Sequence, residues 1–248
     1  MGLLKSIKKR IDWATKVKFD KRTGFYKYNR FGKTIYIRYP RHYLEVNSNI
    51  WNCENLVFHY YLPNPCDVIV DLGAGYGEEA IYLSKYANGF RYIGVEAQPV
   101  IYECLANTFY EAGEEFVASP YVITDKEKVK FASGRSYAAV GEIPAAYIDI
   151  PTMNWEKFIQ SYDISRIDLF KMNIEGAEQQ VIENIKDFNI IKRFIISCHD
   201  FRADNGEGEW YRTKDIVTRK LEERGYVLKG FNYGISWADD WIYAERGT

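Results

Sequence analysis

Short apolar runs rich in β-branched residues alternate along the chain with segments of helical spacing. The run Val68-Ile69-Val70 contains no polar residue, which is typical of a strand buried on both faces of a parallel sheet. Residues 78–84 can continue as a helix, and Tyr92–Val95 forms a second apolar run. A strand, a loop, a helix and a second strand in this order predict an α/β fold.

The second half of the chain continues this alternation. Residues 99–112 have helical spacing, and Pro99 suits the first turn of a helix. Residues 126–151 contain glycines and a proline, and we expect a hairpin or loop insertion there. Further strands are expected at 116–123, in the apolar run before Lys171, at 194–198, and at 226–228 and 241–244, the last two as a terminal antiparallel hairpin. The sum is a Rossmann-like, seven-stranded, mostly parallel sheet.

The N-terminal segment has a different pattern. Residues 1–19 place apolar side chains at helical spacing opposite a basic face, and we favour a helix that covers the core over one that makes a weak contact with an anionic membrane surface. Residues 25–28 and 34–37 predict a β-hairpin, and residues 41–62 a helix. We therefore divide the chain into an N-terminal extension, 1–62, and a main domain, 63–248.

Composition excludes several classes of protein. The 248 residues carry a net charge of −1, so the chain offers no broad basic surface for nucleic acid, and a small or neutral partner fits better. The four cysteines lie far apart with no Cys-x-x-Cys pair, which argues against a zinc cluster or a disulfide scaffold. No apolar stretch suits a transmembrane helix or signal peptide, so we expect a cytoplasmic protein, peripheral to the inner membrane face if the basic helix binds lipid.

A glycine-rich loop follows the first apolar run, in the segment Asp71-Leu72-Gly73-Ala74-Gly75-Tyr76-Gly77. Such a loop crosses the carboxyl edge of the sheet, where open α/β folds bind ligands. A dinucleotide site would need another glycine at position 78, and the Glu78 found there would repel a pyrophosphate. Two carboxylates near the loop favour a cationic ligand, and S-adenosylmethionine (SAM) carries sulfonium and ammonium groups.

Glu96 strengthens this interpretation, because it ends the second apolar run nineteen residues after Gly77. A carboxylate at that point can accept hydrogen bonds from both ribose hydroxyls of an adenosine. The end of the third strand is expected beside the adenine. The predicted SAM-binding residues are Asp71, Gly73, Ala74, Gly75, Gly77, Glu96, Ala97, Thr124 and Asp125.

A second polar cluster follows the strand at residues 167–172. Lys171 and Asn173 are two apart on an extended segment and so point to the same side, while Glu175 is expected in the first turn of the next helix. His199, at the end of the strand 194–198, is the first candidate for a general base, since an imidazole titrates near about 6.5. Lys171 is expected to stabilise a developing alkoxide or orient the acceptor. No metal site is assigned.

These two clusters resemble the motifs of the FkbM family of SAM-dependent methyltransferases. The matching segments are Val70–Gly77, the Val95-Glu96-Ala97-Gln98-Pro99 strand end, residues 168–178 with Glu175-Gly176-Ala177-Glu178, and Ile195–His199. The resemblance implies a class I methyltransferase fold and O-methylation, often of a sugar or polyketide-type hydroxyl. Gly75 stands where the family often has asparagine, and Asn173 replaces its aspartate.

The expected activity is therefore SAM-dependent methylation of a hydroxyl on a saccharide or glycan-linked acceptor. His199, Lys171, Glu175 and Asn173 are the predicted catalytic residues. Two alternatives stay open: a SAM-binding module without catalysis, for which Asn173 is the argument, and a methyltransferase that acts on nitrogen or on a protein side chain. The sequence specifies neither the acceptor nor the oligomeric state.

Overall fold

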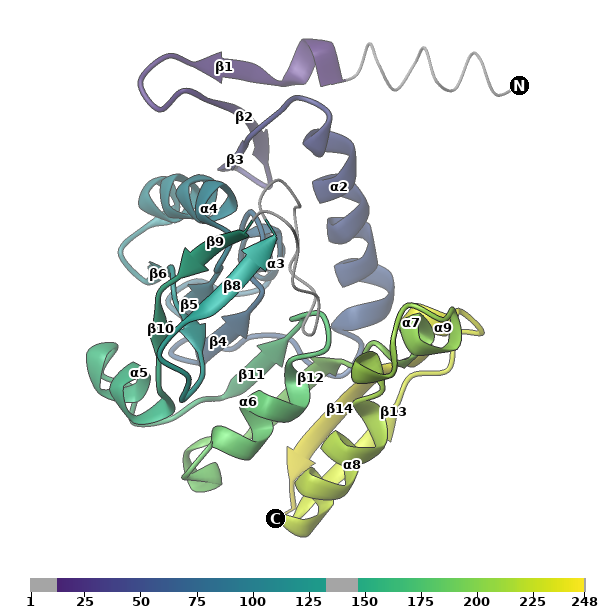
Figure 1. Ribbon diagram of the computed structural model, residues 1–248. Coiled ribbons are helices and arrows are strands. Elements are labelled where there is room, and N and C mark those ends of the chain that lie inside the picture. The colour runs from purple at the N-terminus through teal and green to yellow at the C-terminus, as the bar shows by residue number, and fades with distance from the viewer. Residues whose placement is uncertain (1–12, 133–146, 248) are drawn as a thin grey trace.

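The computed structural model describes residues 13–132 and 147–247, and its centre is a seven-stranded sheet. The strands lie in the order β13-β14-β12-β11-β4-β5-β6 (Figure 1). Their bounds are β4 Val68–Leu72, β5 Arg91–Val95, β6 Phe116–Ser119, β11 Leu169–Met172, β12 Arg193–Ser197, β13 Tyr226–Gly230 and β14 Trp241–Arg246. Strand β14 runs antiparallel to both β12 and β13, while the other neighbours pair parallel. The predicted α/β fold and its terminal antiparallel hairpin are confirmed.

Helices and apolar clusters cover both faces of this sheet. One face carries α2 His42–Asn52, α3 Glu78–Leu83 and α4 Pro99–Ala112, and the other carries α5 Trp155–Ser161, α6 Glu178–Asn184 and α8 Lys214–Glu223. The short helices are α7 Asp200–Asp204 and α9 Ser236–Asp239, with single turns at Phe188–Ile190 and Glu209–Tyr211. Helix α4 has the predicted ends, since Gln98 Oε1 accepts hydrogen bonds from the Val100 and Ile101 N–H groups at 2.7 and 2.9 Å.

The N-terminal segment forms a three-stranded antiparallel sheet at the top of Figure 1, consisting of β1 Lys18–Asp20, β2 Phe25–Arg30 and β3 Lys33–Ile37. The backbone N–H of Tyr36 donates to Thr108 Oγ1 of α4 at 3.0 Å, which fastens β3 to the main domain. The predicted hairpin is confirmed, and β1 extends it by an edge strand. Residues 1–12, and with them most of the segment expected to contact a membrane, lie outside the described residues. Among the helices of the described residues, none combines the length and the apolar composition that a membrane span requires.

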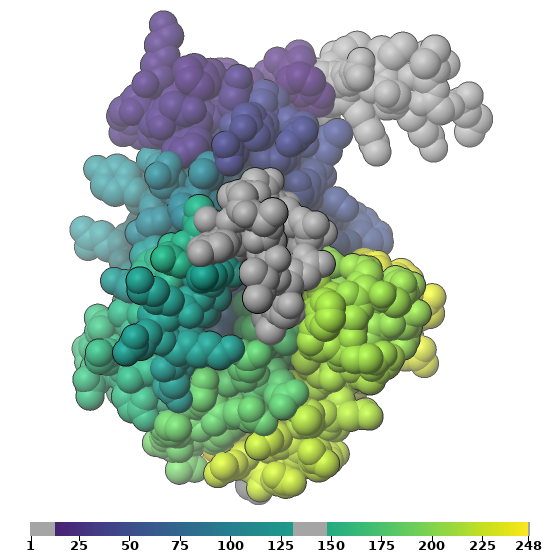
Figure 2. All heavy atoms as spheres, in the orientation of Figure 1, coloured from purple at the N-terminus to yellow at the C-terminus, as the bar shows by residue number. Residues whose placement is uncertain are grey.

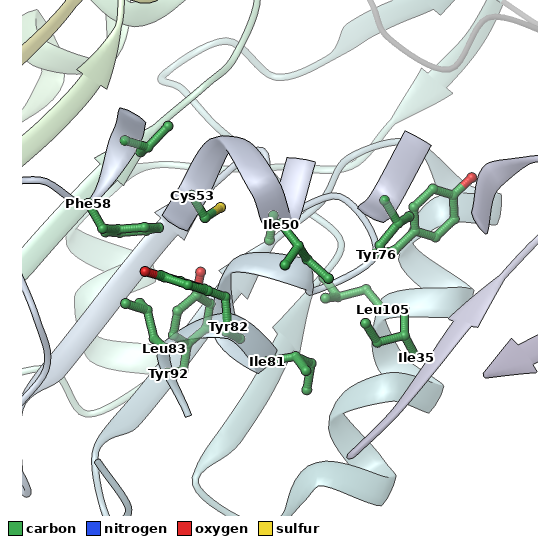
Figure 3. Packing of buried hydrophobic residues seen from close by; sticks show 14 of the residues in the cluster. Ile35, Ile50, Cys53, Phe58, Tyr76, Ile81, Tyr82, Leu83, Tyr92 and Leu105 are labelled. Atoms are coloured by element: carbon green, nitrogen blue, oxygen red, sulfur yellow. The ribbon is translucent and has the colours of Figure 1, made fainter. Parts of the chain in front are cut away.

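The helix predicted over residues 41–62 is shorter than expected. Helix α2 is followed by a π-helical turn, Cys53–Val57, and then by irregular chain. The turn brings Phe58 against Tyr82 of α3 with 5.8 Å between the ring centroids, and Ile50 of α2 lies in the same apolar cluster (Figure 3). Residues from the N-terminal sheet, α2, α3 and α4 thus share one core. The domain boundary at residue 62 stays a prediction.

The strand predicted over residues 116–123 is interrupted. Strand β6 stays in the central sheet, but β7 Val122–Ile123 leaves it and pairs with β10 Thr152–Met153. Pro120 lies between the two strands, and a proline cannot donate a ladder hydrogen bond. The hairpin expected within 126–151 is present as β8 Val129–Ala132 and β9 Tyr147–Ile150, and its connection, 133–146, lies outside the described residues.

Candidate functional site

The glycine loop joins β4 to α3 and is held between the ends of two other strands. Gly73, Gly75 and Gly77 all have positive φ, at 81°, 55° and 88°. The N–H groups of Gly73 and Ala74 donate to the carbonyl of Val95, at 2.9 and 3.0 Å. On the other side, a Cβ atom added to Gly73 would lie 2.1 Å from the backbone oxygen of Asn173. Only glycine therefore fits at position 73, and the loop is a tight cradle.

Glu96 lies at the end of β5 and contacts this loop directly. Its Oε2 accepts a hydrogen bond from Gly75 N–H at 3.1 Å, and its Oε1 accepts one from Gln98 N–H at 2.8 Å. Burial raises the pKa of Glu96 to about 7, although these two N–H groups act in the opposite direction. Each carboxylate oxygen keeps a further lone pair, so Glu96 can still accept hydrogen bonds from ligand hydroxyls.

The arrangement fits a cofactor that contains adenosine. The glycines allow the positive φ angles that bend the loop, and Glu96 offers hydroxyl acceptors beside them. Ala97 follows Glu96 directly. Thr124 is buried and its N–H donates to Met153 O, whereas Asp125 is exposed; both follow β7, which has left the central sheet. Their expected place beside an adenine stays a prediction.

Asp71 does not offer a free carboxylate to a ligand, contrary to the expectation from the sequence. It is fully buried, its Oδ1 lies 2.9 Å from Lys171 Nζ, and its Oδ2 accepts a hydrogen bond from Tyr92 OH at 2.5 Å. Lys171 also contacts Glu79 Oε1 at 3.1 Å. Burial lowers the pKa of Lys171, but the two carboxylates outweigh burial and raise it. Lys171 is therefore a buried cation that positions α3 against β4.

A cavity of about 220 Å³ lies next to the loop, between α2 and the carboxyl ends of β11 and β12. Asn173, Glu175 and His199 line it, so the structure brings together three of the four predicted catalytic residues. The fourth, Lys171, is only 1% exposed and belongs to the buried cluster behind the cavity. This placement corrects the expectation that Lys171 contacts the acceptor. Figure 2 shows that the α7 and α8 region lies at the surface, across from the β7 to β10 segments.

His199 is held by two carboxylates. Its Nδ1 lies 3.0 Å from Glu178 Oε1, and its Nε2 lies 3.6 Å from Glu175 Oε2. Burial lowers the pKa of His199, but the hydrogen bond to Glu178 and the charges of both carboxylates outweigh it, and the pKa is raised. The imidazole lines the cavity and can exchange a proton with a bound group there.

Glu175 does not lie in the first turn of a helix as predicted. It adopts a left-handed backbone conformation with φ of 57°, Gly176 follows with φ of 95°, and α6 begins only at Glu178. A right-handed helix cannot include these two conformations. The Glu175 carboxylate instead contacts Arg202 Nη2 at 2.9 Å, which holds it beside His199.

A match to a protein-family model identifies the family of the chain. The model described as the methyltransferase FkbM domain matches residues 71–228, a range that includes the glycine loop, Glu96, the Lys171 segment and His199. The chain belongs to the FkbM methyltransferase family. It is therefore a SAM-dependent methyltransferase, and its sheet is that of a class I methyltransferase.

Solved structures similar to this FkbM methyltransferase include a fibrillarin in complex with Nop5p, at 13% identity, with 94% of this chain and 98% of that chain covered and a TM-score of 0.52. Fibrillarin from Aeropyrum pernix with S-adenosyl-L-methionine gives 16% identity, coverages of 78% and 76%, and a TM-score of 0.45. TrmK from M. capricolum with S-adenosyl-homocysteine is 14% identical, with 82% of this chain and 68% of that chain covered and a TM-score of 0.43. Identities this low describe the fold alone. No curated protein matches the chain.

Several residues that line the cavity of this FkbM methyltransferase were not among the predicted site residues. Glu79 resembles an ordinary helix-forming acid, and Trp241 resembles a core residue of the last strand, yet both line the cavity. Helix α2 also contributes the side chains of Asn49 and Asn52. Only the spatial neighbourhood reveals these four residues, because no local motif joins them to the glycine loop.

Proposed function

We propose that the protein transfers the methyl group of SAM to a hydroxyl of a saccharide or glycan-linked acceptor. The observation that carries the proposal is His199, a buried imidazole that lines the cavity next to the glycine loop and is paired through Nδ1 with Glu178. A hydroxyl must lose its proton when it becomes an ether, and a base within hydrogen-bond reach of it supplies that step.

The cofactor and the acceptor are handled by two neighbouring groups of residues. Glu96 and the glycine loop are suited to hold SAM, which supplies an activated methyl group when bound. His199 Nε2 takes the proton of the acceptor hydroxyl, and Glu175 and Glu178 stabilise the imidazolium that results. The remaining rate acceleration comes from the positioning of SAM and the acceptor, since aligned reactants reach effective molarities of about 10⁵ M or more.

The residues that line the cavity suit a saccharide. Phe201, Trp237 and Trp241 contribute aromatic surface, while Asn49, Asn52, Asn173 and Ser197 add polar groups. Ligand sites combine apolar and aromatic walls with a few polar groups that fix orientation. A sugar ring presents both kinds of surface, and the net charge of −1 adds no general attraction for a polyanion.

The experiment is a transfer assay with methyl-labelled SAM and a pooled panel of glycans and nucleotide sugars. We expect alkali-stable label on a sugar product with the wild-type protein, and a loss of about 10²-fold or more in His199→Gln. His59→Gln is the matched control, because His59 is exposed, and it should retain full activity. SAM binding with label on an amine or a protein would contradict the proposal.

Asn173→Asp separates catalysis from simple cofactor binding. Asn173 lines the cavity beside Glu79 and Glu175. We expect the wild-type protein to be active without an acid at position 173. Activity that appears only in Asn173→Asp would instead favour a SAM-binding module that has lost catalysis.

A further inference from the structure

Three polar atoms of the described cavity residues lack a hydrogen-bond partner, and one of them, Glu175 Oε2, is in an ion pair with Arg202. Within the described part of the chain, Trp241 Nε1 and Glu79 Oε2 are both buried without a partner. Trp241 is 6% exposed and Glu79 is 9% exposed. Buried donors and acceptors in native proteins are almost always paired, so each orphan needs an explanation. Trp241 Nε1 is a donor, and Glu79 Oε2 belongs to a carboxyl group.

The two atoms belong to different walls of the same cavity. Glu79 is the second residue of α3, and Trp241 is the first residue of β14, paired in register with Ser197 at the end of β12. Helix α2 supplies a further wall through Asn49 and Asn52. The predicted SAM-binding residues of the described chain are absent from the lining. The cavity therefore adjoins the cofactor loop and remains distinct from it.

The size of the cavity sets the size of its occupant. About 220 Å³ is less than the roughly 300–1,000 Å³ of a site that encloses a drug-sized ligand. One ring of an acceptor fits this space, with the remainder of a larger molecule outside. Trp237 and Phe201 contribute aromatic surface to the same space.

We propose that this cavity is the acceptor subsite and binds a polyhydroxylated ring, in which Trp241 Nε1 donates a hydrogen bond to one oxygen and Glu79 Oε2 pairs with a neighbouring hydroxyl. The inference rests on the proposed function and names the groups that recognise its acceptor. Trp241 lies outside residues 71–228, the range matched by the family model, so the proposed contact is made by a part of the chain that the model does not cover.

Hydroxyl groups suit both orphan atoms better than an amine does. An indole N–H only donates, and an ammonium group has nothing to accept with. Burial raises the pKa of Glu79, against the opposing effect of Lys171, and a hydroxyl suits the carboxyl group in either protonation state. A hydroxyl donates to the ionised carboxylate and accepts from the protonated acid.

The test compares Trp241→Phe with Trp51→Phe, a control on the exposed surface of α2. The transfer assay gives kcat and KM for the best sugar acceptor, and calorimetry gives the Kd for SAM. We expect Trp241→Phe to raise the acceptor KM about 5-fold to 10-fold, the effect of one hydrogen bond, with the Kd for SAM unchanged. An unchanged KM would overturn the subsite, and a weakened Kd for SAM would show that the cavity holds the cofactor.

A second measurement does not depend on methyl transfer. Saturation-transfer NMR with the methyl glycosides of glucose, rhamnose and fucose reports binding to the protein without SAM. We expect contact signals in the wild type and in Trp51→Phe, reduced signals in Trp241→Phe, and reduced signals in Glu79→Gln if the Trp241 variant fails to fold. Signals that persist in both cavity variants overturn the inference. Glycoside binding without any label transfer would leave the subsite standing and count against the proposed function.

Discussion

His199 Nδ1 lies 3.0 Å from Glu178 Oε1, with both side chains buried. Glu178 is fixed in turn, because its Oε1 accepts a hydrogen bond from Gly176 N–H at 3.2 Å and its Oε2 accepts one from Thr213 Oγ1 at 3.3 Å. An ionised carboxylate only accepts hydrogen bonds, so Nδ1 carries the proton and Nε2 is left as the basic atom. The pair therefore sets both the tautomer and the orientation of the imidazole.

The raised pKa of His199 predicts the pH dependence of the reaction. A general base works only when it is deprotonated, so kcat/KM should increase with pH through a midpoint above the ordinary value of about 6.5. Glu175→Gln removes a negative charge 3.6 Å from Nε2 and should move this midpoint to lower pH. Glu183→Gln, on the exposed side of α6, should leave it unchanged. A profile with the same midpoint in all three proteins would show that another group titrates.

The buried cation Lys171 predicts a large effect on stability. Lys171→Met leaves Asp71 and Glu79 without their shared counter-charge, and we expect a loss of about 3–5 kcal/mol in the free energy of unfolding. Lys85→Met breaks an exposed pair with Glu54 and should cost less than about 1 kcal/mol. Urea titrations of the two variants test this difference. Equal losses would mean that the buried cluster is no more important than a surface pair.

Alanine substitutions at Gly73 and Gly89 test how closely the cofactor loop is packed against its neighbours. Both have nearly the same positive φ, 81° and 79°, but a Cβ on Gly89 meets nothing within 4 Å. Gly89→Ala should therefore cost only the backbone strain, about 1–2 kcal/mol, whereas Gly73→Ala adds a collision with Asn173 O and should cost about 3–5 kcal/mol. Thermal unfolding compares them, and the order of the two losses is the critical result.

We expect the affinity for SAM to depend on the carboxylate of Glu96. Glu96→Ala removes the acceptor for Gly75 N–H and the carboxylate suited to ribose hydroxyls, and calorimetry should show SAM binding weakened about 10-fold to 100-fold. Glu103→Ala, on the exposed side of α4, serves as the control and should bind as the wild type does. Undiminished binding in Glu96→Ala would place the nucleoside elsewhere.

The sequence was most informative where local rules act alone. Helix α4 has both predicted ends because Gln98 and Pro99 define its start and Gly113 follows its end. The strands on either side of the glycine loop were predictable because the apolar runs at 68–70 and 92–95 are short and clearly bounded, and the loop was predictable because its motif is contiguous in the chain. His199 was found in the same way, since it lies two residues after the end of an apolar strand.

Long-range contacts account for what the sequence did not reveal. Asp71 and Lys171 both belong to recognisable motifs, but nothing local shows that the two side chains neutralise each other across adjacent strands. Glu79 and Trp241 belong to no motif and become cavity residues only when α3 and β14 are placed in space. Glu175 was wrongly predicted in the first turn of a helix, because helical propensity does not predict two consecutive residues with positive φ angles.

The most direct test of the central claim is the fate of a ¹³C-labelled methyl group. SAM carrying this label is incubated with the protein and the sugar panel, and the products are examined by two-dimensional NMR for a methyl ether on a sugar carbon. We expect such an ether with the wild-type protein and its loss in His199→Gln. Label found on nitrogen or on protein, or none transferred while calorimetry shows bound SAM, would contradict it.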